Sequence, residues 1–240
     1  QGVGAEPVSV PERDWTPDVD ALLARVGDRT RVVFVSNPNP TGTYLPHNEL
    51  ARLHAGISEN VLLVIDAAYA EYVTREDYAS GVELVGAADN VVMTRTFSKA
   101  YGLAGLRLGW CYGPADVIGV LNRLRGPFNV TAPAQAAGVA AVEDTAFIER
   151  ARQHNTTWIG WLQNELERLG LQHIPSVTNF VCVGFRDQNK TAAAAIDHMM
   201  GDGILVRDMN AYGLPDHVRI TIGLEDETRA VVESLERFLG

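Results

Sequence analysis

Three short runs of apolar residues, many of them β-branched, constrain the fold of this chain more than any other feature. They span residues 31–35, 61–65 and 91–94 and are typical of buried strands. Helical spacing of apolar residues covers 46–58 between the first two runs, and a loop with a short helix is expected over 74–88. This alternation predicts an α/β fold with a mainly parallel sheet and helices on both faces.

A change of pattern near residue 145 divides the chain. The sheet of the first part is expected to continue over 106–112. Later segments have the spacing of helices (133–142, 146–169, 191–200 and 225–239) or of strands (180–183, 204–207 and 218–222). The sequence therefore predicts an incomplete large domain over 1–145 and a small α+β domain over 146–240.

A polar residue follows each of the first three apolar runs. Asn39 lies in a proline-rich turn after the first run, Asp66 ends the second, and Lys99 follows the third. Taken alone, Asp66 fits a helix cap or a structural ion pair as well as a site, because a buried acid needs a partner. Ligands of parallel sheets bind at the carboxyl ends of the strands. Three polar groups at one edge therefore predict a ligand site there.

The residues around Lys99 indicate what that site binds. Thr96 and Ser98 precede the lysine, and Arg107 follows a glycine-bearing turn. Hydroxyl and guanidinium groups bind phosphate well. A lysine beside another cation in a partly dry cleft loses basicity and can act as a Schiff-base nucleophile. An isolated Ser-Lys pair is more often a surface feature, and it is the other two strand ends that favour a site here.

Composition excludes several classes of function. The net charge is −10, from 20 basic and 30 acidic residues, which argues against nucleic acid or an anionic membrane as partner. No apolar window is long enough to span a membrane, and the histidines lack metal-ligand spacing. Cys111 and Cys182 lie in apolar runs and are expected to be buried free thiols, which suits a cytoplasmic protein.

Taken in order, four motifs resemble the fold-type I aminotransferases, which use pyridoxal 5'-phosphate. They are Asn-Pro-Thr-Gly beginning at Asn39, Asp66-x-x-Tyr69, Ser98-Lys99, and Arg107. The resemblance covers essentially the whole chain. Residues 96–107, 203–208 and 212–223 are most similar to the histidinol-phosphate aminotransferase subfamily.

The resemblance implies a role for each residue at the cofactor ring. Lys99 is expected to form the internal aldimine and to move the proton between the substrate's α-carbon and the cofactor. Asp66 would pair with the pyridine nitrogen, which makes the ring an electron sink. Asn39 and Tyr69 would hydrogen-bond to the ring's 3-oxygen. The resemblance also implies three ligands of the cofactor phosphate: Thr96, Ser98 and Arg107.

The implied reaction transfers an amino group between L-histidinol phosphate and 2-oxoglutarate, a step of histidine biosynthesis. Arg219 would hold the anionic end of these substrates, Arg207 would help with the phosphate, and Asn179 matches an asparagine near the substrate. Ala67 stands where the family usually has glutamate. Full-length relatives carry an upstream segment with a glycine-rich turn, a stacking aromatic and an arm that reaches the partner subunit. We therefore expect the sequence to be a fragment and the intact protein to be a homodimer.

Other functions remain open at this point. The same superfamily contains aromatic-amino-acid aminotransferases and decarboxylases of O-phosphorylated amino acids. A non-catalytic domain that senses pyridoxal phosphate within a regulator is an alternative from a different class. The ordered catalytic residues favour the enzyme.

Overall fold

The computed structural model describes residues 3–187 and 189–240, which form two units. The first unit comprises residues 3–40 and Tyr44–Thr145. The second comprises Thr41–Thr43 and Ala146–Gly240. A short piece of the loop that follows the first strand therefore belongs to the second unit.

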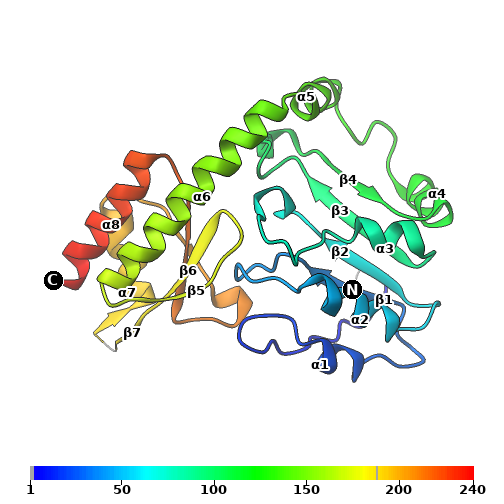
Figure 1. Ribbon diagram of the computed structural model, residues 1–240, viewed down its shortest axis with the longest axis horizontal. Coiled ribbons are helices and arrows are strands. Elements are labelled where there is room, and N and C mark those ends of the chain that lie inside the picture. The colour runs from blue at the N-terminus through cyan, green and yellow to red at the C-terminus, as the bar shows by residue number, and fades with distance from the viewer. Residues whose placement is uncertain (1–2, 188) are drawn as a thin grey trace. The chain divides into compact units, whose positions relative to one another are not determined.

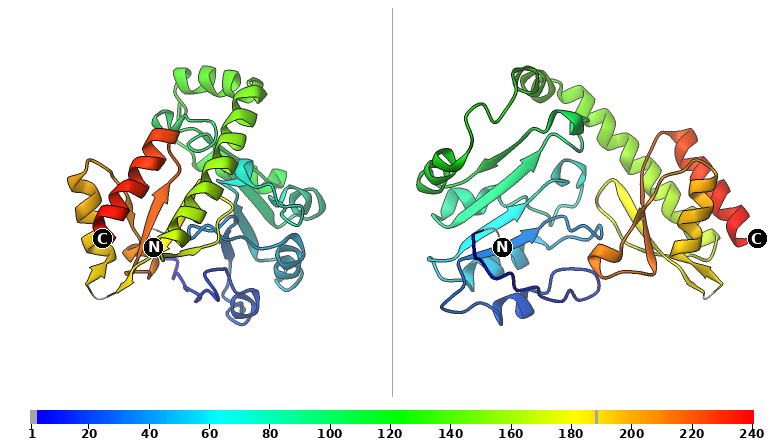
Figure 2. Two further views of the ribbon diagram at one scale, coloured as in Figure 1. Left: turned by 60° about the vertical axis from the view of Figure 1, so that its left-hand side comes forward. Right: turned by 180° about the vertical axis from the view of Figure 1, so that it is seen from behind.

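The first unit is built on a four-stranded sheet in the order β1-β2-β3-β4 (Figure 1). The strands are β1 (Val32–Ser36), β2 (Leu62–Asp66), β3 (Val91–Thr96) and β4 (Gly109–Tyr112). The first three strands run parallel, and β4 runs antiparallel to β3. Figure 2 shows the same strands, coloured blue to green, from two other directions. The predicted α/β class with a mainly parallel sheet is confirmed.

Alternate side chains of these strands form the core of the first unit, because successive strand residues point to opposite faces. Val33, Leu63 and Ile65 are buried. Three helices pack against this face: α1 (Val19–Leu23), α2 (His47–Ala55) and α3 (Val82–Ala87). On the other face of β1, Val32 and Phe34 are 52% and 59% exposed. Each fully buried side chain of this size contributes about 1.5–3 kcal/mol, so the helix-covered face holds the strands in place.

The connections of the first unit are short turns and two further helices. Two 3-10 turns follow strand ends, η1 (Ala70–Tyr72) after β2 and η2 (Ala104–Leu106) after β3. Helices α4 (Ala115–Leu124) and α5 (Ala132–Glu143) follow β4. The turns therefore lie beside the residues expected to form the site.

The second unit contains an antiparallel sheet in the order β5-β6-β10-β9. Its strands are β5 (Gln172–Ile174), β6 (Phe180–Gly184), β9 (Arg207–Asp208) and β10 (His217–Thr221). Three helices supply its core together with the sheet: α6 (Thr145–Arg168), α7 (Ala192–Gly201) and α8 (Glu225–Leu239). Leu166, Val183, Ile220 and Leu235 are fully buried there or nearly so. The smaller elements are β7 (Arg186–Asp187), β8 (Lys190–Thr191) and η3 (Asn210–Tyr212).

Local sequence signals set the ends of two helices. The Asp18 carboxylate accepts the N–H groups of Asp20 and Ala21 at 3.0 and 3.1 Å and caps α1. Gly170 follows α6 with φ +74°, a conformation that glycine adopts without a side-chain clash. Asp18 therefore caps the start of α1, and Gly170 ends α6.

Two predicted strands differ from the structure. The strand expected over 106–112 begins only at Gly109, because Arg107 has φ 53° and breaks the extended backbone. Of the strand expected over 204–207, only Arg207 is in a strand, β9 (Arg207–Asp208), which pairs with β10. The three-residue strand β5 carries no apolar alternation, and the sequence does not predict it.

The two cysteines provide a test of this packing. Both thiols are free; Cys111 on β4 is partly exposed, whereas Cys182 on β6 is fully buried. Burial raises the pKa of the Cys182 thiol to about 12. We expect iodoacetamide at mildly alkaline pH to alkylate Cys111 and to spare Cys182 until urea unfolds the chain, because the thiolate is the reactive form. Peptide mass spectrometry measures both sites; equal modification of the folded chain would contradict the buried position.

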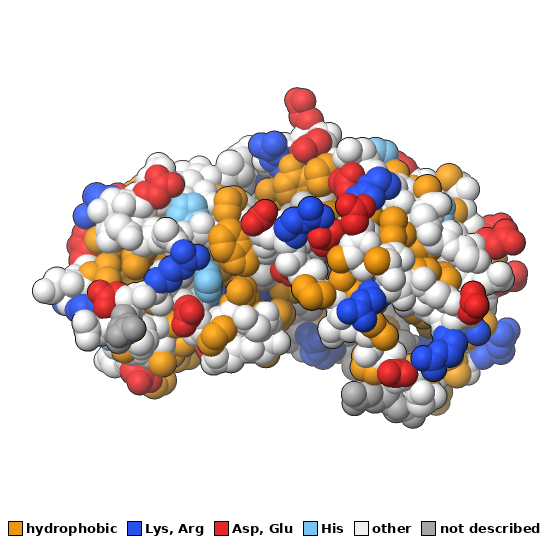
Figure 3. Space-filling view, turned by 90° about the horizontal axis from the view of Figure 1, so that it is seen from below, with side chains coloured by type: hydrophobic (Ala, Val, Ile, Leu, Met, Phe, Trp, Pro, Cys, Tyr) orange, Lys and Arg blue, Asp and Glu red, His pale blue; other side chains and the backbone are white. Residues whose placement is uncertain are grey.

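Charges of both signs are mixed on the surface that Figure 3 draws, where no broad basic area gathers. This agrees with the excess of acidic over basic residues in the sequence. Within residues 3–187 and 189–240, none of the helices has both the length and the apolar character that crossing a bilayer requires.

Candidate active site

The register of the parallel strands brings three predicted site residues to one edge of the sheet. Ser36 pairs with Asp66, and Asp66 pairs with Thr94, so β1, β2 and β3 end side by side. Asp66 is the last residue of β2, and Asn39 and Lys99 each follow the end of a neighbouring strand by three residues. The carboxyl edge of the sheet therefore carries all three.

Lys99 and Tyr69 meet at this edge. The Lys99 Nζ atom lies 5.1 Å from the centre of the Tyr69 ring, a distance typical of a cation–π contact. Lys99 is one of only two lysines in the sequence, the other being Lys190. The backbone holds the lysine in a tight turn, because Lys99 O accepts the N–H of Gly102 at 2.9 Å. An amine is thus fixed against an aromatic phenol.

Asp66 has a partner that the sequence-based prediction does not include. Thr94 Oγ1 donates to Asp66 Oδ1 at 3.2 Å from the adjacent strand. The two residues pair directly in the parallel register. Within residues 3–187 and 189–240, Asp66 forms no ion pair with a lysine, arginine or histidine. Its carboxylate is therefore oriented by a hydroxyl and keeps capacity to accept further hydrogen bonds.

The predicted phosphate ligands are partly brought together. Arg107 Nη1 lies 3.5 Å from Ser98 Oγ and donates to the Ala104 carbonyl at 2.6 Å. Thr96 Oγ1 accepts the Ser98 N–H at 3.0 Å and so braces the turn before Lys99. In the described part of the chain, neither Lys99 nor Arg107 forms an ion pair with a carboxylate. Two cations and a hydroxyl group therefore flank this turn, as an anionic group requires.

Asn39 makes contacts that differ from the expected contact with a cofactor ring. Its side chain is buried, and Nδ2 donates to Glu12 Oε1 at 2.8 Å and to the Trp15 carbonyl at 3.0 Å. Burial raises the pKa of the Glu12 carboxyl, and the hydrogen bond from Asn39 offsets part of the rise. The amide hydrogens both point to acceptors of the preceding segment. Any donation to a ligand would have to replace one of these bonds.

Asn37 is a structural residue of the same loop that the sequence-based prediction misses. It is fully buried, and its Oδ1 accepts the Leu45 N–H at 2.8 Å while Nδ2 donates to the Leu45 carbonyl at 3.1 Å. Nδ2 also lies 3.5 Å from the Ala79 carbonyl. The amide thus closes the loop that carries Asn39. Its place immediately before Pro38, at the end of an apolar strand, is the signal that could have identified it.

The second unit contains the three residues predicted to bind substrate. Arg207 and Arg219 occupy directly paired positions on β9 and β10. Like charges at such positions repel, and no carboxylate in residues 3–187 and 189–240 forms an ion pair with either. The Arg219 guanidinium lies 4.4 Å from the Phe180 ring centre, and its Nε is buried without a hydrogen-bond partner in the part of the chain that the structure describes. The paired guanidinium groups therefore suit an anion. Asn179 precedes β6, and its backbone carbonyl accepts the Ile222 N–H at 2.9 Å.

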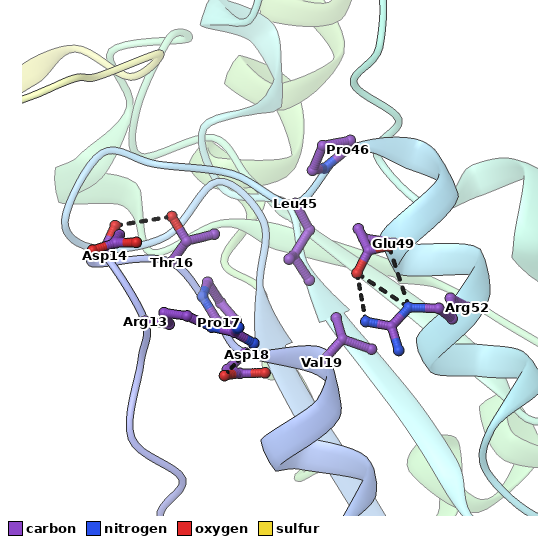
Figure 4. Close-up of a pocket in the computed structure, with 10 residues that line it drawn as sticks. All are labelled: Arg13, Asp14, Thr16, Pro17, Asp18, Val19, Leu45, Pro46, Glu49 and Arg52. Atoms are coloured by element: carbon purple, nitrogen blue, oxygen red, sulfur yellow. Dashed lines mark hydrogen bonds and ion pairs between the residues drawn. The ribbon is translucent and has the colours of Figure 1, made fainter.

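A separate surface groove of about 330 Å³ lies on the first unit (Figure 4). It is lined by Arg13, Asp14, Thr16, Pro17, Asp18, Val19, Leu45, Pro46, Glu49 and Arg52. Its arginines are already paired, Arg13 with Asp18 at 2.6 Å and Arg52 with Glu49 at 2.7 Å. None of the residues predicted to bind cofactor or substrate lines it. We therefore assign the candidate active site to the sheet edge.

Known proteins resemble this chain over nearly its whole length. The family model "Aminotransferase class I and II" matches residues 1–235. Histidinol-phosphate aminotransferases of Paramagnetospirillum magneticum and Rhodospirillum centenum are each 56% identical to the chain, over 99% and 100% of its length. The chain spans 66% of the length of each of these relatives.

A solved structure shares the fold over nearly the whole chain. It is histidinol-phosphate aminotransferase from Sinorhizobium meliloti in complex with pyridoxal-5'-phosphate, with a TM-score of 0.90 and 30% identity. The match covers 97% of this chain and 64% of that one. Fold, ordered motifs and family match agree, and the chain therefore belongs to the class I and II aminotransferase family.

Proposed function

We propose that the intact protein is a pyridoxal-phosphate-dependent aminotransferase that exchanges an amino group between L-histidinol phosphate and 2-oxoglutarate. The observation that carries the proposal is the contact of Lys99 with Tyr69 at the sheet edge where Asp66 ends its strand. The names of the relatives at 56% identity support the choice of substrate. The ligand in the Sinorhizobium meliloti structure supports the choice of cofactor.

The donors and acceptors at this edge fit pyridoxal phosphate. When bound, the cofactor supplies an electron sink for the charge that develops at the substrate's α-carbon. Asp66 would accept the N–H of the pyridine nitrogen, with Thr94 holding the carboxylate. Three residues would hold the cofactor phosphate: Thr96, Ser98 and Arg107. The absence of a carboxylate paired with Lys99 or Arg107 in residues 3–187 and 189–240 supports this assignment.

Lys99 would carry the proton transfers. Its Nζ would hold the cofactor, give way to the substrate's amine, and then take the proton from the substrate's α-carbon. Tyr69 would donate to the ring's 3-oxygen. Asn39 would do so after exchanging its bond to Glu12 or Trp15. We assign the catalytic roles to Lys99, Asp66 and Tyr69.

The second unit would recognise the substrates. Arg219 would bind the anionic end of each substrate in turn, with Arg207 beside it for the phosphate. Their paired positions support an anionic ligand, as does Arg219 Nε, which has no hydrogen-bond partner among the described residues. Asn179 would lie near the substrate. We further propose that the intact protein acts in the cytoplasm. We also propose that it is a homodimer, and sedimentation of the intact protein tests its oligomeric state.

A substrate profile of the intact protein tests the proposed function. We expect kcat/KM for L-histidinol phosphate to exceed that for phenylalanine by at least about 100-fold. The apolar side chain of phenylalanine would leave the cations of a phosphate-binding site without a partner. Coupled detection of glutamate formed from 2-oxoglutarate measures both rates. Preferred turnover of phenylalanine would assign an aromatic-amino-acid aminotransferase instead. Release of carbon dioxide from an O-phosphorylated amino acid would assign a decarboxylase.

A further inference from the structure

A largely buried ion pair, between Arg95 and Glu71, lies in the first unit next to the candidate active site. Arg95 Nη2 donates to Glu71 Oε1 at 2.6 Å, and the two side chains are only 18% and 7% exposed. Glu71 Oε2 and Arg95 Nε are buried without a hydrogen-bond partner among the described residues. An ion pair of this kind with unused polar atoms contributes little to stability, because proteins in which apolar residues of similar volume replace such a pair are often as stable or more stable. Its position in the fold is therefore the feature to explain.

The pair joins the two segments that carry Tyr69 and Lys99. Glu71 lies in the turn η1, where Tyr72 N donates to Tyr69 O at 3.1 Å, so Tyr69 and Glu71 move together. Arg95 is the penultimate residue of β3, the strand that leads into the turn of Lys99. The pair thus links the turn after β2 to the end of β3.

Arg95 is also held from the opposite strand. Its guanidinium carbon lies 5.8 Å from the ring centre of Trp110, the residue that pairs with it on β4. The planar guanidinium is therefore fixed by a carboxylate and an aromatic ring, a geometry for which arginine is better suited than lysine. Burial raises the pKa of the nearby Tyr72 phenol to about 12, with the charge of Glu71 adding to the rise. The Tyr72 phenol stays neutral, and the Glu71 charge is matched by Arg95.

We infer that Glu71 and Arg95 are positioning residues that set the placement of Tyr69 against Lys99, and through it the binding of the cofactor ring. The inference rests on the proposed function, since it assigns Tyr69 to the ring's 3-oxygen. Neither residue of the pair touches the cofactor in this assignment. The 5.1 Å contact between Lys99 and Tyr69 is the distance that the pair maintains.

A double-mutant cycle in the intact protein tests this inference. The variants are Glu71→Gln, Tyr69→Phe and the two combined, and the readout is the dissociation constant of pyridoxal phosphate measured from its absorbance. We expect Glu71→Gln to weaken binding about tenfold in the wild-type background and less than about twofold in the Tyr69→Phe background, because residues that act through one another are not additive. The pH midpoint of the bound cofactor's absorbance change should follow the same pattern.

Two further variants serve as the control and as the replacement for a variant that does not fold. Glu49→Gln removes the carboxylate of a surface pair with Arg52 at 2.7 Å in the same unit, and it should leave binding unchanged. Arg95→Lys keeps the positive charge but loses the planar guanidinium that binds the carboxylate. If Glu71→Gln does not fold, Arg95→Lys takes its place in the double-mutant cycle with Tyr69→Phe. The same loss in both Tyr69 backgrounds would overturn the inference and assign the pair to folding alone. The inference would also be overturned if Glu71→Gln and Glu49→Gln bound pyridoxal phosphate with the same dissociation constant.

The same experiment separates this inference from the proposed function. If the wild-type protein binds pyridoxal phosphate but does not turn over histidinol phosphate, the proposed substrate is wrong and the cycle can still be measured. If the wild-type protein does not bind the cofactor, the proposed function and the positioning role are both overturned.

Discussion

Replacing Lys99 with alanine is expected to lower transamination by the intact protein at least about 10³-fold, the largest effect of any single substitution. The loss of a positioned general base alone costs about 10²–10⁴-fold, and the same substitution removes the amine that would hold the cofactor. Lys99 Nζ is the amine that the structure fixes at the sheet edge, 5.1 Å from the Tyr69 ring centre. Steady-state rates give kcat, and borohydride reduction followed by peptide mass spectrometry locates the trapped cofactor.

The chain provides a matched control for this experiment. Lys190 is the only other lysine in the sequence. It belongs to the second unit, where its ammonium lies 4.9 Å from the ring centre of Phe238. Lys190→Ala should keep both the reducible bond and the rate. A cofactor label that persists in Lys99→Ala, or that maps to Lys190, would show that the assignment of the nucleophile is wrong.

The sheet edge could be predicted from sequence because its strands are encoded locally. Runs such as 61–65 are apolar throughout, a pattern typical of strands in a parallel sheet, and the polar residue that ends each run is visible in the sequence. Parallel pairing then places the ends of such strands together. Asp66 and Lys99 could therefore be found without coordinates.

Contacts between distant segments could not be predicted in the same way. The pairing of Asn39 with Glu12 depends on how residues 27 positions apart meet, and that of Glu71 with Arg95 on residues 24 apart. No period or motif in the sequence encodes these distances. Short polar strands could not be predicted for a related reason. Strand β9 is only two residues long and is defined by its pairing with β10. The sheet edge was thus predictable, whereas the side-chain contacts around it were not.

Asn37→Ala is expected to lower the free energy of unfolding of the first unit by about 3 kcal/mol or more. The substitution leaves the N–H and the carbonyl of Leu45 without their partner in a buried loop, and each unsatisfied group costs about 1–3 kcal/mol. Both bonds are short, 2.8 and 3.1 Å, and Asn37 is fully buried. Hydrogen exchange of peptides from β1 and β2 measures the change within this unit.

The control for this prediction is Asn60→Ala, which removes the same side chain from an exposed position before β2. Surface substitutions of this kind stay within about 0.5 kcal/mol. If the two variants exchange at the same rate, the amide of Asn37 does not hold the loop. If Asn37→Ala alone exchanges faster, the loop that carries Asn39 loses its closure, and cofactor affinity in the intact protein should fall with it. Asn37 would then support the site through the backbone, as Glu71 and Arg95 are proposed to do from the next strand connection.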